Sequence, residues 1–555
     1  MRKELPIGIE DYDKSQNYYY VDKTLIIDEI IRSMIGKSIL VTRPRRFGKT
    51  LTVSMLEYFF SNQLDSGSLF SDKKIASTAS YAYLNKYPVI HINMRTINGS
   101  NEEEIIYKAI NNLSSLYEKH QYLLNSNKLS DVDKTYYRSV ITKSFNHNYL
   151  YQDSLFKLSS FLSKHFNEKV IILIDEYDTP CESSYENKIY EKTIGFFKEL
   201  YSNALKGNDN VLFSFVTGVL EISKESLFSG LNNMSVHSVI DNKLNGYFGF
   251  TKEETIELLE DYNLLDKYDE LEKWYGGYEF GNIVLFNPWS IINYVEKQQI
   301  RPYWVNTAQT NIIRELLVGH VKEDFLSLVN SQYQAIMFNN AINYLDFTHD
   351  KNAIYSYLTQ AGYIIAKYKE APNLYSVRIP NREIYEVFKN DIIAKEFNIS
   401  LLQIASRLRV AFENNKVDDI SLILNEYIVS SLSYYDVKNE KTYQTLLTGI
   451  LAVLFDTHIV KSEVNTLKGR CDIMVSPKQD NDVGLIVEVK YRQNVKSVLS
   501  SNKLKESAKA AINQIKSHNY YQELLRRKCS KILLYGIAFD INGDNALESK
   551  EINNN

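Results

Sequence analysis

The chain has 555 residues, 44% of them hydrophobic and 24% charged, and a formal net charge of −4. This is an ordinary globular composition, and the length predicts three or four compact units rather than one core. The charged start Met1–Pro6 lacks the apolar core of a signal peptide, and no apolar run has membrane length, so we expect neither feature. Three cysteines, Cys181, Cys471 and Cys529, fit a reducing cytoplasm without zinc ligation.

A candidate phosphate-binding loop lies near the N-terminus. The apolar run Ser38–Thr42 predicts a strand, and the loop from Arg43 then leads into an apolar helical run. This order points backbone N–H groups at an anion, while Lys49 reaches the terminal phosphates and the Thr50 hydroxyl meets Mg²⁺. The pattern G-x-x-x-x-G-K-[ST] requires a glycine where this chain has Arg43. Only the ending of the pattern, Gly48-Lys49-Thr50, is therefore present.

A second element supports a nucleotide site. The continuous apolar strand Val170–Ile174 ends in Asp175 and Glu176, which is a Walker B pattern. In P-loop ATPases the first acid helps to hold Mg²⁺, and a following glutamate can polarise the attacking water. The alternative is a solvated acidic pair where a strand enters a loop. The Gly-Lys-Thr sequence about 125 residues upstream favours the ATPase interpretation.

Two more apolar runs, Val89–Asn93 and Val211–Gly218, predict further buried strands. Strands that alternate with helices indicate a parallel sheet, so we expect an α/β fold. The second run ends in Thr217, which is either a sensor of the γ-phosphate or merely a threonine at the end of a strand.

A change of pattern follows the predicted sheet. Thr251 and Glu254 form a capping-box pattern, so a helix and a new region are expected to start there. Helices dominate the next 145 residues or so, with a small strand pair predicted at 363–366 and 374–381. We predict a helical lid or winged-helix-like region that binds DNA or merely couples the two ends of the chain. The expected domains are 1–250, 251–395 and 396–545, followed by a flexible tail at 546–555.

The C-terminal part carries two acids and a lysine on strand-like segments. Ile473–Val475 follows Asp472 and Gly484–Val487 precedes Glu488, so neighbouring buried strands would bring both carboxylates together. Mg²⁺ is typically held by one or two carboxylates plus water and substrate phosphate. Lys490 projects to the same strand face as Glu488 and can stabilise negative charge or orient water. The pattern therefore points to metal-dependent phosphodiester cleavage, although a solvated strand face would give similar spacing.

The sequence around these strands is basic. Residues 484–531 hold eleven Lys or Arg against three Glu, in a chain that is acidic overall. A helix is predicted from Lys503 to Arg527 and a strand from Ile532 to Phe539. This asymmetry suggests a surface that faces phosphates, and the alternative is a lysine-rich solvated helix.

Residues 440–540 resemble the PD-(D/E)XK nuclease superfamily, in the form found behind an AAA-ATPase-like domain in many bacterial proteins. The residues that carry the resemblance are Glu440, Tyr443, Ser462, Glu463, Gly469, Arg470, Asp472, Glu488, Lys490, Gln514, Ile515 and Tyr520. By that resemblance Asp472 and Glu488 bind metal and Lys490 is catalytic. Glu463 and Gln514 support the site, and Glu440 completes the metal shell. Gln444 stands where relatives often have histidine.

The N-terminal half resembles the AAA-ATPase-like family that is usually joined to this nuclease. The matching segments are Tyr20–Thr24, Arg43–Thr50, Asp175–Asp178, Thr217–Val219, Phe228–Asn233, Trp274–Tyr278 and Asn287–Trp289. The resemblance makes the missing first glycine a family trait. Arg45 and Arg46 are unusual in a phosphate loop, where they contact phosphate, act on a neighbouring subunit or form salt bridges elsewhere.

Together these features predict an ATP-binding and ATP-hydrolysing protein whose nucleotide state controls a metal-dependent nuclease. The competing interpretation is a nucleotide-dependent switch that binds nucleic acid without cleaving it. ATP and Mg²⁺, or Mn²⁺ at the nuclease site, are the expected cofactors, and DNA is favoured over RNA as partner. Antiviral defence is a hypothesis for the biological role, and a homo-oligomer or another protein partner is left open. The predicted nucleotide-site residues are Arg45, Arg46, Phe47, Gly48, Lys49, Thr50, Asp175, Glu176 and Thr217, and the predicted metal ligands are Thr50, Asp175, Glu440, Asp472 and Glu488.

Overall fold

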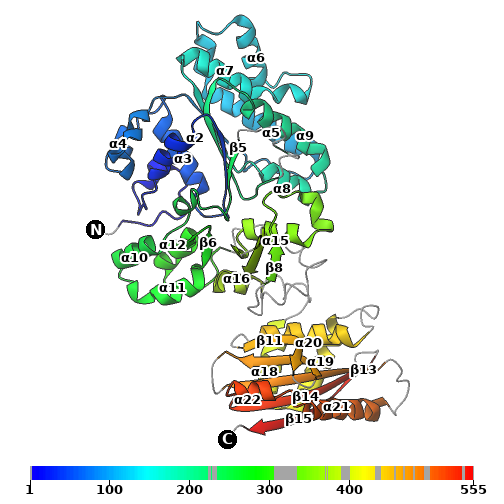
Figure 1. Ribbon diagram of the computed structural model, residues 1–555. Coiled ribbons are helices and arrows are strands. Elements are labelled where there is room, and N and C mark those ends of the chain that lie inside the picture. Colours follow the sequence, from blue (N-terminus) through cyan, green and yellow to red (C-terminus); the bar gives the residue numbers. More distant parts are fainter. Residues whose placement is uncertain are drawn as a thin grey trace. The chain divides into compact units, whose positions relative to one another are not determined.

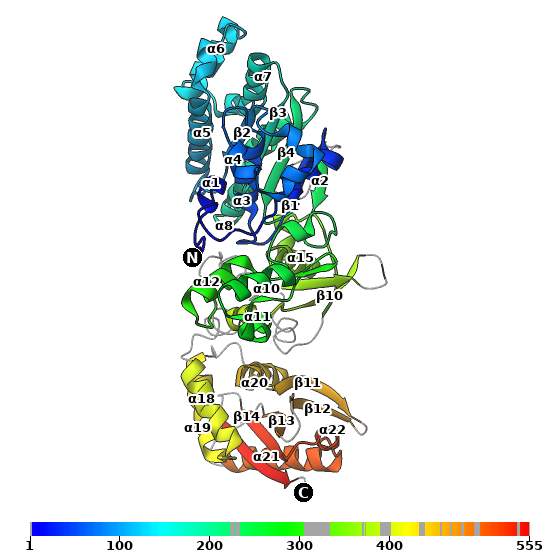
Figure 2. The ribbon, with the colours of Figure 1, turned by 90° about the vertical axis from the view of Figure 1, so that its left-hand side faces the viewer.

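The computed structural model forms two compact units (Figures 1 and 2). The described residues are 3–222, 227, 234–304, 334–368, 371, 373–388, 401–431, 439–454, 458–466, 469–478, 482–492, 500–540 and 544–553. The first unit contains the described residues up to 304 together with 335–384, and the second contains Gln334 and the described residues from Tyr385 onward. Among the described residues, no helix is both long and apolar enough to cross a membrane. The predicted segment Phe228–Asn233 lies outside the described residues.

The first unit is built around a five-stranded, fully parallel sheet in the order β2-β3-β4-β1-β5. The four strands that the sequence predicts in the N-terminal half all belong to this sheet. Two of them, β1 and β3, are buried at every position, as expected for strands in a sheet covered on both faces. The strands are β1 (Ser38–Thr42), β2 (Val89–Asn93), β3 (Val170–Asp175), β4 (Val211–Gly218) and β5 (Met234–His237).

Helices cover both sides of this sheet. Figure 1 shows α2, α3 and α4 on one side and α5, α8 and α9 on the other. Within the unit α3 packs against β3 and β4, α5 against β2, and α7 against β3. The helices are α1 (Tyr12–Ser15), α2 (Leu25–Met34), α3 (Lys49–Phe60), α4 (Gly67–Phe70), α5 (Glu102–Lys119), α6 (Asp131–Ile141), α7 (Ser154–Phe166), α8 (Thr179–Glu186) and α9 (Tyr190–Leu205).

The region after residue 250 belongs to the same compact unit. Its predicted first helix is present, and the Thr251 and Glu254 side chains form the expected capping box. The predicted strand pair is also present as antiparallel β9 and β10, which a third strand, β8, extends. The elements are α10 (Lys252–Asp261), α11 (Tyr268–Tyr275), β6 (Tyr278–Phe280), β7 (Ile283–Leu285), α12 (Pro288–Lys297), β8 (Gln334–Met337), α15 (Lys351–Gln360), β9 (Ile365–Tyr368), β10 (Leu374–Arg378) and α16 (Arg382–Val387). The expected boundary at 250 thus falls inside this unit, because Phe250 pairs through its backbone with Phe286.

The second unit holds a five-stranded mixed sheet in the order β11-β12-β13-β14-β15. Only β13 and β14 are parallel, and the other neighbours are antiparallel. Helix α20 packs on β11, β12 and β13, and α21 packs on β13, β14 and β15. The elements are α18 (Leu401–Glu413), α19 (Val417–Ser431), α20 (Glu440–Leu454), β11 (His458–Thr466), β12 (Gly469–Pro477), β13 (Val483–Arg492), α21 (Ser500–Ser517), α22 (Gln522–Arg526), β14 (Lys531–Asp540) and β15 (Asn545–Asn553).

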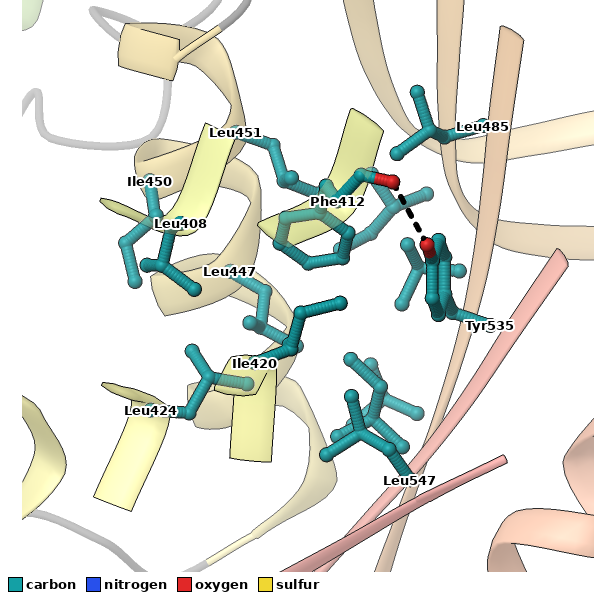
Figure 3. Close-up of a cluster of buried hydrophobic side chains, with 14 of the residues drawn as sticks. Leu408, Phe412, Ile420, Leu424, Leu447, Ile450, Leu451, Leu485, Tyr535 and Leu547 are labelled. Carbon is teal, nitrogen blue, oxygen red and sulfur yellow. Dashed lines mark hydrogen bonds between the residues drawn. The ribbon is translucent and has the colours of Figure 1, made fainter. Parts of the chain in front are cut away.

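Alternation along the strands builds a core on each face of this sheet. On the face covered by α18, α19 and α20, Leu485 and Tyr535 pack with helix side chains such as Phe412 (Figure 3). The Tyr535 hydroxyl donates a 3.0 Å hydrogen bond to the Phe412 carbonyl, which ties the sheet to the end of α18. On the opposite face, Ile486 and Leu534 pack with α21 and α22.

Two sequence expectations about the C-terminal end are corrected. The predicted helix from Lys503 to Arg527 is two helices, α21 and α22, and Asn519 between them takes a positive φ of 54°. The expected flexible tail at 546–555 is wrong as far as residue 553. There β15 pairs along β14 and buries Ala546 and Leu547, so a polar segment becomes an edge strand.

Candidate functional site

Polar side chains from three strand ends and a helix meet at the carboxyl edge of the parallel sheet. Asp175 is fully buried at the end of β3, where its Oδ2 accepts hydrogen bonds from Thr50 Oγ1 at 2.9 Å and Asn93 Nδ2 at 2.8 Å. Its Oδ1 accepts from Thr217 Oγ1 at 2.7 Å. Burial, and next the charge of Glu176, raise the pKa of Asp175. The structure thus brings together Thr50, Asp175 and Thr217, and adds Asn93, which the sequence analysis missed.

The lysine of the phosphate-binding loop folds back onto the loop itself. Lys49 opens α3, and its buried Nζ donates to the carbonyl oxygens of Arg43 and Pro44 at 3.1 and 3.3 Å. It also lies 3.9 Å from Glu176 Oε1. Gly48 has a φ of 89°, a conformation that a glycine adopts without strain, and precedes the helix directly. The loop therefore has the geometry of an anion cradle at a helix N-terminus.

Arg43, which replaces the consensus glycine, lies in the protein core. Its guanidinium donates to the carbonyl oxygens of Thr42 and His237 at 2.8 and 2.9 Å. It also lies 5.3 Å from the ring centroids of both Phe248 and Phe280. Burial lowers the pKa of Arg43 to about 9. The arginine thus connects the base of the loop to the region after β5.

The other two loop arginines form ion pairs at the surface of a cavity. Arg45 lies 2.6 Å from Glu182, and the indole of Trp304 donates to its backbone carbonyl at 3.0 Å. Arg46 lies over the Trp289 ring at 4.4 Å from the centroid. Of the three roles that the sequence left open for Arg45 and Arg46, the structure shows ion pairing, with Glu182 and Glu10 respectively. Contact with phosphate remains a prediction.

The loop opens into a cavity of about 520 Å³, a volume within the usual range for a small-molecule site. Seven of the nine predicted nucleotide-site residues line it, namely Arg45, Arg46, Phe47, Gly48, Lys49, Thr50 and Glu176. Asp175 and Thr217 are not among the lining residues, and Asp175 reaches the cavity wall through its hydrogen bond with Thr50. Other walls come from the N-terminal segment, including Tyr19 and Tyr20, and from Trp289 on α12. The cavity therefore has a polar, cationic end at the loop and an aromatic end, as a nucleotide requires.

In the second unit, the predicted acids and the lysine converge on β12 and β13. Asp472 Oδ2 accepts from the Val489 backbone N–H at 2.7 Å, which fixes the two strands to each other beside the site. Glu488 Oε1 accepts from Lys490 Nζ at 3.2 Å and from the Gln514 side chain. Burial raises the pKa of Glu488 to about 7, with Asp472 as the next cause, and burial likewise raises the pKa of Asp472.

Three further predicted residues, and the glutamine that stands where relatives often have histidine, differ in their contacts with Asp472 and Glu488. Gln514 on α21 contacts Glu488 directly. Gln444, where relatives often have histidine, donates to the Asp472 carbonyl at 3.0 Å and so positions that strand. Glu463 forms an ion pair with Arg470 at 2.7 Å. Glu440 is exposed at the start of α20 and acts on Asp472 electrostatically, without a described hydrogen bond between them.

The carboxylates of the second unit fit a divalent cation. Glu488 Oε2 is buried and has no hydrogen-bond partner in the described part of the chain. A buried oxygen of this kind is costly unless an ion or water meets it. Asp472 and Glu488 would hold the ion, although among the described residues no group of three or more His, Cys, Asp or Glu side chains is gathered closely enough to do so. Mg²⁺ with two carboxylates and water needs no third. In the first unit, Thr50 and Asp175 fit Mg²⁺ in the same way, since both present oxygens at one point.

Two family models match the two ends of the chain. Residues 6–228 match the family described as predicted AAA-ATPase, and residues 438–548 match the PD-(D/E)XK nuclease superfamily. The chain therefore combines an AAA-ATPase-like domain at its N-terminal end with a PD-(D/E)XK nuclease superfamily domain at its C-terminal end.

One curated relative is described as an uncharacterised protein in the vnfD 5′ region of Azotobacter chroococcum mcd 1. The chain is 29% identical to it over 322 residues, which are 57% of this chain and 56% of that protein. The chain thus spans little more than half the length of this relative. A solved structure, Drosophila ORC bound to DNA, aligns over 66% of this chain and 85% of that one, with 8% identity and a TM-score of 0.21.

Proposed function

We propose that the first unit binds and hydrolyses ATP. The observation that carries this proposal is the convergence of Thr50 and Asp175 beside the Lys49 loop, at the end of a cavity large enough for a nucleotide. Bound Mg²⁺ would neutralise charge on the phosphates. Lys49 would exchange its loop carbonyls for phosphate oxygens, and Glu176 would orient the attacking water. Thr217 would hold Asp175 in position through its 2.7 Å hydrogen bond.

The second unit then cleaves a phosphodiester bond of nucleic acid, with DNA as the favoured substrate. The supporting observation is the buried, unpaired Glu488 oxygen beside Asp472 and Lys490. A divalent cation there would activate water and stabilise charge on the phosphate. Lys490 would stabilise negative charge at the scissile phosphate, and Gln514 would fix the orientation of Glu488. Nucleotide state in the first unit controls this cleavage.

The test is cleavage of labelled single- and double-stranded DNA and RNA with Mg²⁺ or Mn²⁺, with and without ATP. Asp472→Ala and Lys490→Ala should abolish cutting and leave ATP hydrolysis unchanged. Lys461→Ala is the matched control, because Lys461 is an exposed lysine on β11 of the same unit. Cutting that survives in Lys490→Ala refutes the catalytic assignment. Nucleic acid that binds but is never cut supports the switch interpretation instead.

The nucleotide control has its own readout in the same assay. Lys49→Ala should remove any effect of ATP on cutting while leaving the metal-dependent reaction itself intact. Equal ATP responses in wild type and Lys49→Ala would show that the ATP effect does not pass through this loop.

The cellular setting is proposed on narrower grounds. Cys181, Cys471 and Cys529 are all buried and none forms a disulfide, which supports a reducing compartment such as the cytoplasm. The pairing of a nucleotide site with a cleavage site motivates a role in antiviral defence. A strain that lacks the gene and resists a broad phage panel as well as its parent would remove the support for that role.

A further inference from the structure

A carboxylate from the N-terminal segment is paired with two arginines at the mouth of the nucleotide cavity. Glu10 accepts from both terminal nitrogens of Arg95, at 2.6 and 3.0 Å, in the bidentate geometry that arginine also uses for phosphate. Glu10 also lies 3.6 Å from the guanidinium of Arg46. We call Glu10, Arg46 and Arg95 the Glu10 cluster. Neither Glu10 nor Arg95 belongs to the motifs that predicted the nucleotide site.

The Glu10 cluster lies next to the position where the end of a triphosphate would be held. Arg95 follows β2 in the chain and donates to Thr50 Oγ1 at 3.4 Å. The same Thr50 hydroxyl donates to Asp175, and in P-loop proteins this hydroxyl meets the Mg²⁺ that bridges the β- and γ-phosphates. All three members of the cluster line the cavity. Two guanidinium groups therefore face the terminal-phosphate end, and an internal carboxylate neutralises about half of their charge.

Among the three carboxylates paired with cations of the loop, Glu10 is the one most easily displaced. Glu182, paired with Arg45, is 12% exposed, and Glu176, near Lys49, is 15% exposed, whereas Glu10 is 35% exposed. A partly hydrated carboxylate regains water when its partner leaves, so its exchange for another anion costs little.

Arg46 keeps a contact that would hold it in place after the exchange, because its guanidinium rests on the Trp289 ring of α12. Glu10, in contrast, belongs to a short segment held at its two ends. On one side the Tyr12 backbone N–H donates to Ser54 Oγ at 2.9 Å, and on the other the Tyr19 backbone N–H donates to the Glu4 carbonyl at 2.8 Å. Both views place the N-terminal segment beside α12 (Figures 1 and 2). Residues 6–11, between these two anchors, can therefore change conformation without disturbing the loop or the sheet.

We propose that Glu10 occupies, as an internal anion, the place of the terminal phosphate of a nucleoside triphosphate. The triphosphate displaces Glu10 from Arg46 and Arg95, whereas a diphosphate is too short to do so. The N-terminal segment thereby distinguishes the two nucleotides, and its release is the signal that hydrolysis reverses. This inference rests on the proposed function of the first unit as a nucleotide site, but not on the nuclease.

The test is calorimetric titration of the full-length protein with ATPγS and with ADP, both with Mg²⁺. Glu10→Gln removes the competing charge, so ATPγS should bind about fivefold more tightly while ADP binding is unchanged. Arg95→Ala should weaken ATPγS about tenfold or more and ADP little, and Arg95→Lys should recover only part of this loss, because lysine lacks the bidentate fork. Glu4→Gln and Arg138→Ala are matched controls at exposed positions outside the cavity.

Segment release has a second readout in hydrogen exchange of residues 6–11. ATPγS should increase exchange there relative to ADP in the wild type, and Glu10→Gln should show fast exchange with either nucleotide. Nucleotide-free melting temperatures show whether each variant is folded, and Arg95, at 49% exposure, is not required by the core. If the ratio of ATPγS affinity to ADP affinity is unchanged in both Glu10→Gln and Arg95→Ala, the inference about Glu10 is wrong, while the proposed nucleotide site still stands. A wild type that binds neither nucleotide overturns the proposed function as well.

Discussion

Replacement of Glu488 by glutamine should stabilise the metal-free second unit, and the gain should grow as the pH rises from 5 to 8. The folded unit raises the pKa of Glu488 from 4.5 to about 7, chiefly by burial. Because the fold binds this proton more tightly than the unfolded chain does, the group favours folding most below pH 4.5. That contribution is lost as the pH rises through about 7. The glutamine carries no charge at any pH and therefore escapes this loss.

The magnitude follows from the shift. One pKa unit corresponds to about 1.4 kcal/mol, so a shift from 4.5 to about 7 makes ionised Glu488 cost about 3 kcal/mol at pH 8. Glu488→Gln should accordingly exceed the wild type in free energy of unfolding by up to about 3 kcal/mol at pH 8 and by less than about 1 kcal/mol at pH 5. Mn²⁺ should reverse the order at pH 8, because only the wild type binds it and binding to the folded state adds stability.

Urea unfolding with EDTA at pH 5 and pH 8 measures this difference. The chain has three tryptophans, Trp274, Trp289 and Trp304, and all belong to the first unit, so tryptophan fluorescence follows that unit alone. Far-ultraviolet circular dichroism reports the unfolding of both units. The part of its change that occurs at other urea concentrations than the fluorescence change is therefore assigned to the second unit. Glu506→Gln, at an exposed position on α21, is the control. A stability difference that is equal at the two pH values would refute the reasoning, as would a wild type that is the more stable at pH 8.

Three further substitutions test the first unit. Lys49→Ala should weaken nucleotide binding by a factor on the order of 100, measured by titration calorimetry, because the loop then lacks its charge for the terminal phosphates. Equal affinity would show that nucleotide binds elsewhere. Glu176→Gln should bind ATP normally but hydrolyse it at least about a hundredfold more slowly, as measured by phosphate release, since the amide is a poor base. Undiminished hydrolysis would assign that role to another residue. Arg43→Gly restores the consensus glycine but leaves a void between Phe248 and Phe280, so the melting temperature should fall by several degrees, consistent with a loss of about 2 kcal/mol or more. A variant that melts like wild type would show that the buried guanidinium contributes nothing.

The sequence predicts the central strands well because their burial leaves a simple pattern. Val170–Ile174 is apolar throughout and Val89–Asn93 is apolar at three of its five positions, and such runs are typical of strands in a covered parallel sheet. The meeting of Thr50 with Asp175 follows from topology, because parallel strands present their carboxyl ends at one edge. Asp472 and Glu488 were found for a related reason, since each adjoins a short apolar strand and the two strands pair.

The features that escaped prediction depend on contacts between residues far apart in the chain. Arg43 is a charged residue whose burial requires Phe248 and Phe280, about 200 positions away. Arg95 can be recognised as part of the nucleotide cavity only from its ion pair with Glu10, which lies 85 positions earlier in the chain. No local periodicity encodes such pairs. The boundary expected near 250 lies inside the first unit for a similar reason, because the capping box correctly marks a helix start but says nothing about which residues that helix packs against.

The polar strand β15 also protects its neighbour. Nine of the ten residues of β14 are buried, and the strand carries the apolar run Ile532–Leu534. Without β15, the N–H and C=O groups along that side of β14 would form an open sheet edge, a known template for pairing with other chains. β15 instead presents charged residues such as Lys550 and Glu551 at the rim. A shortened protein that stops at residue 544 would therefore be prone to self-association through β14, even with both carboxylates and Lys490 still in place.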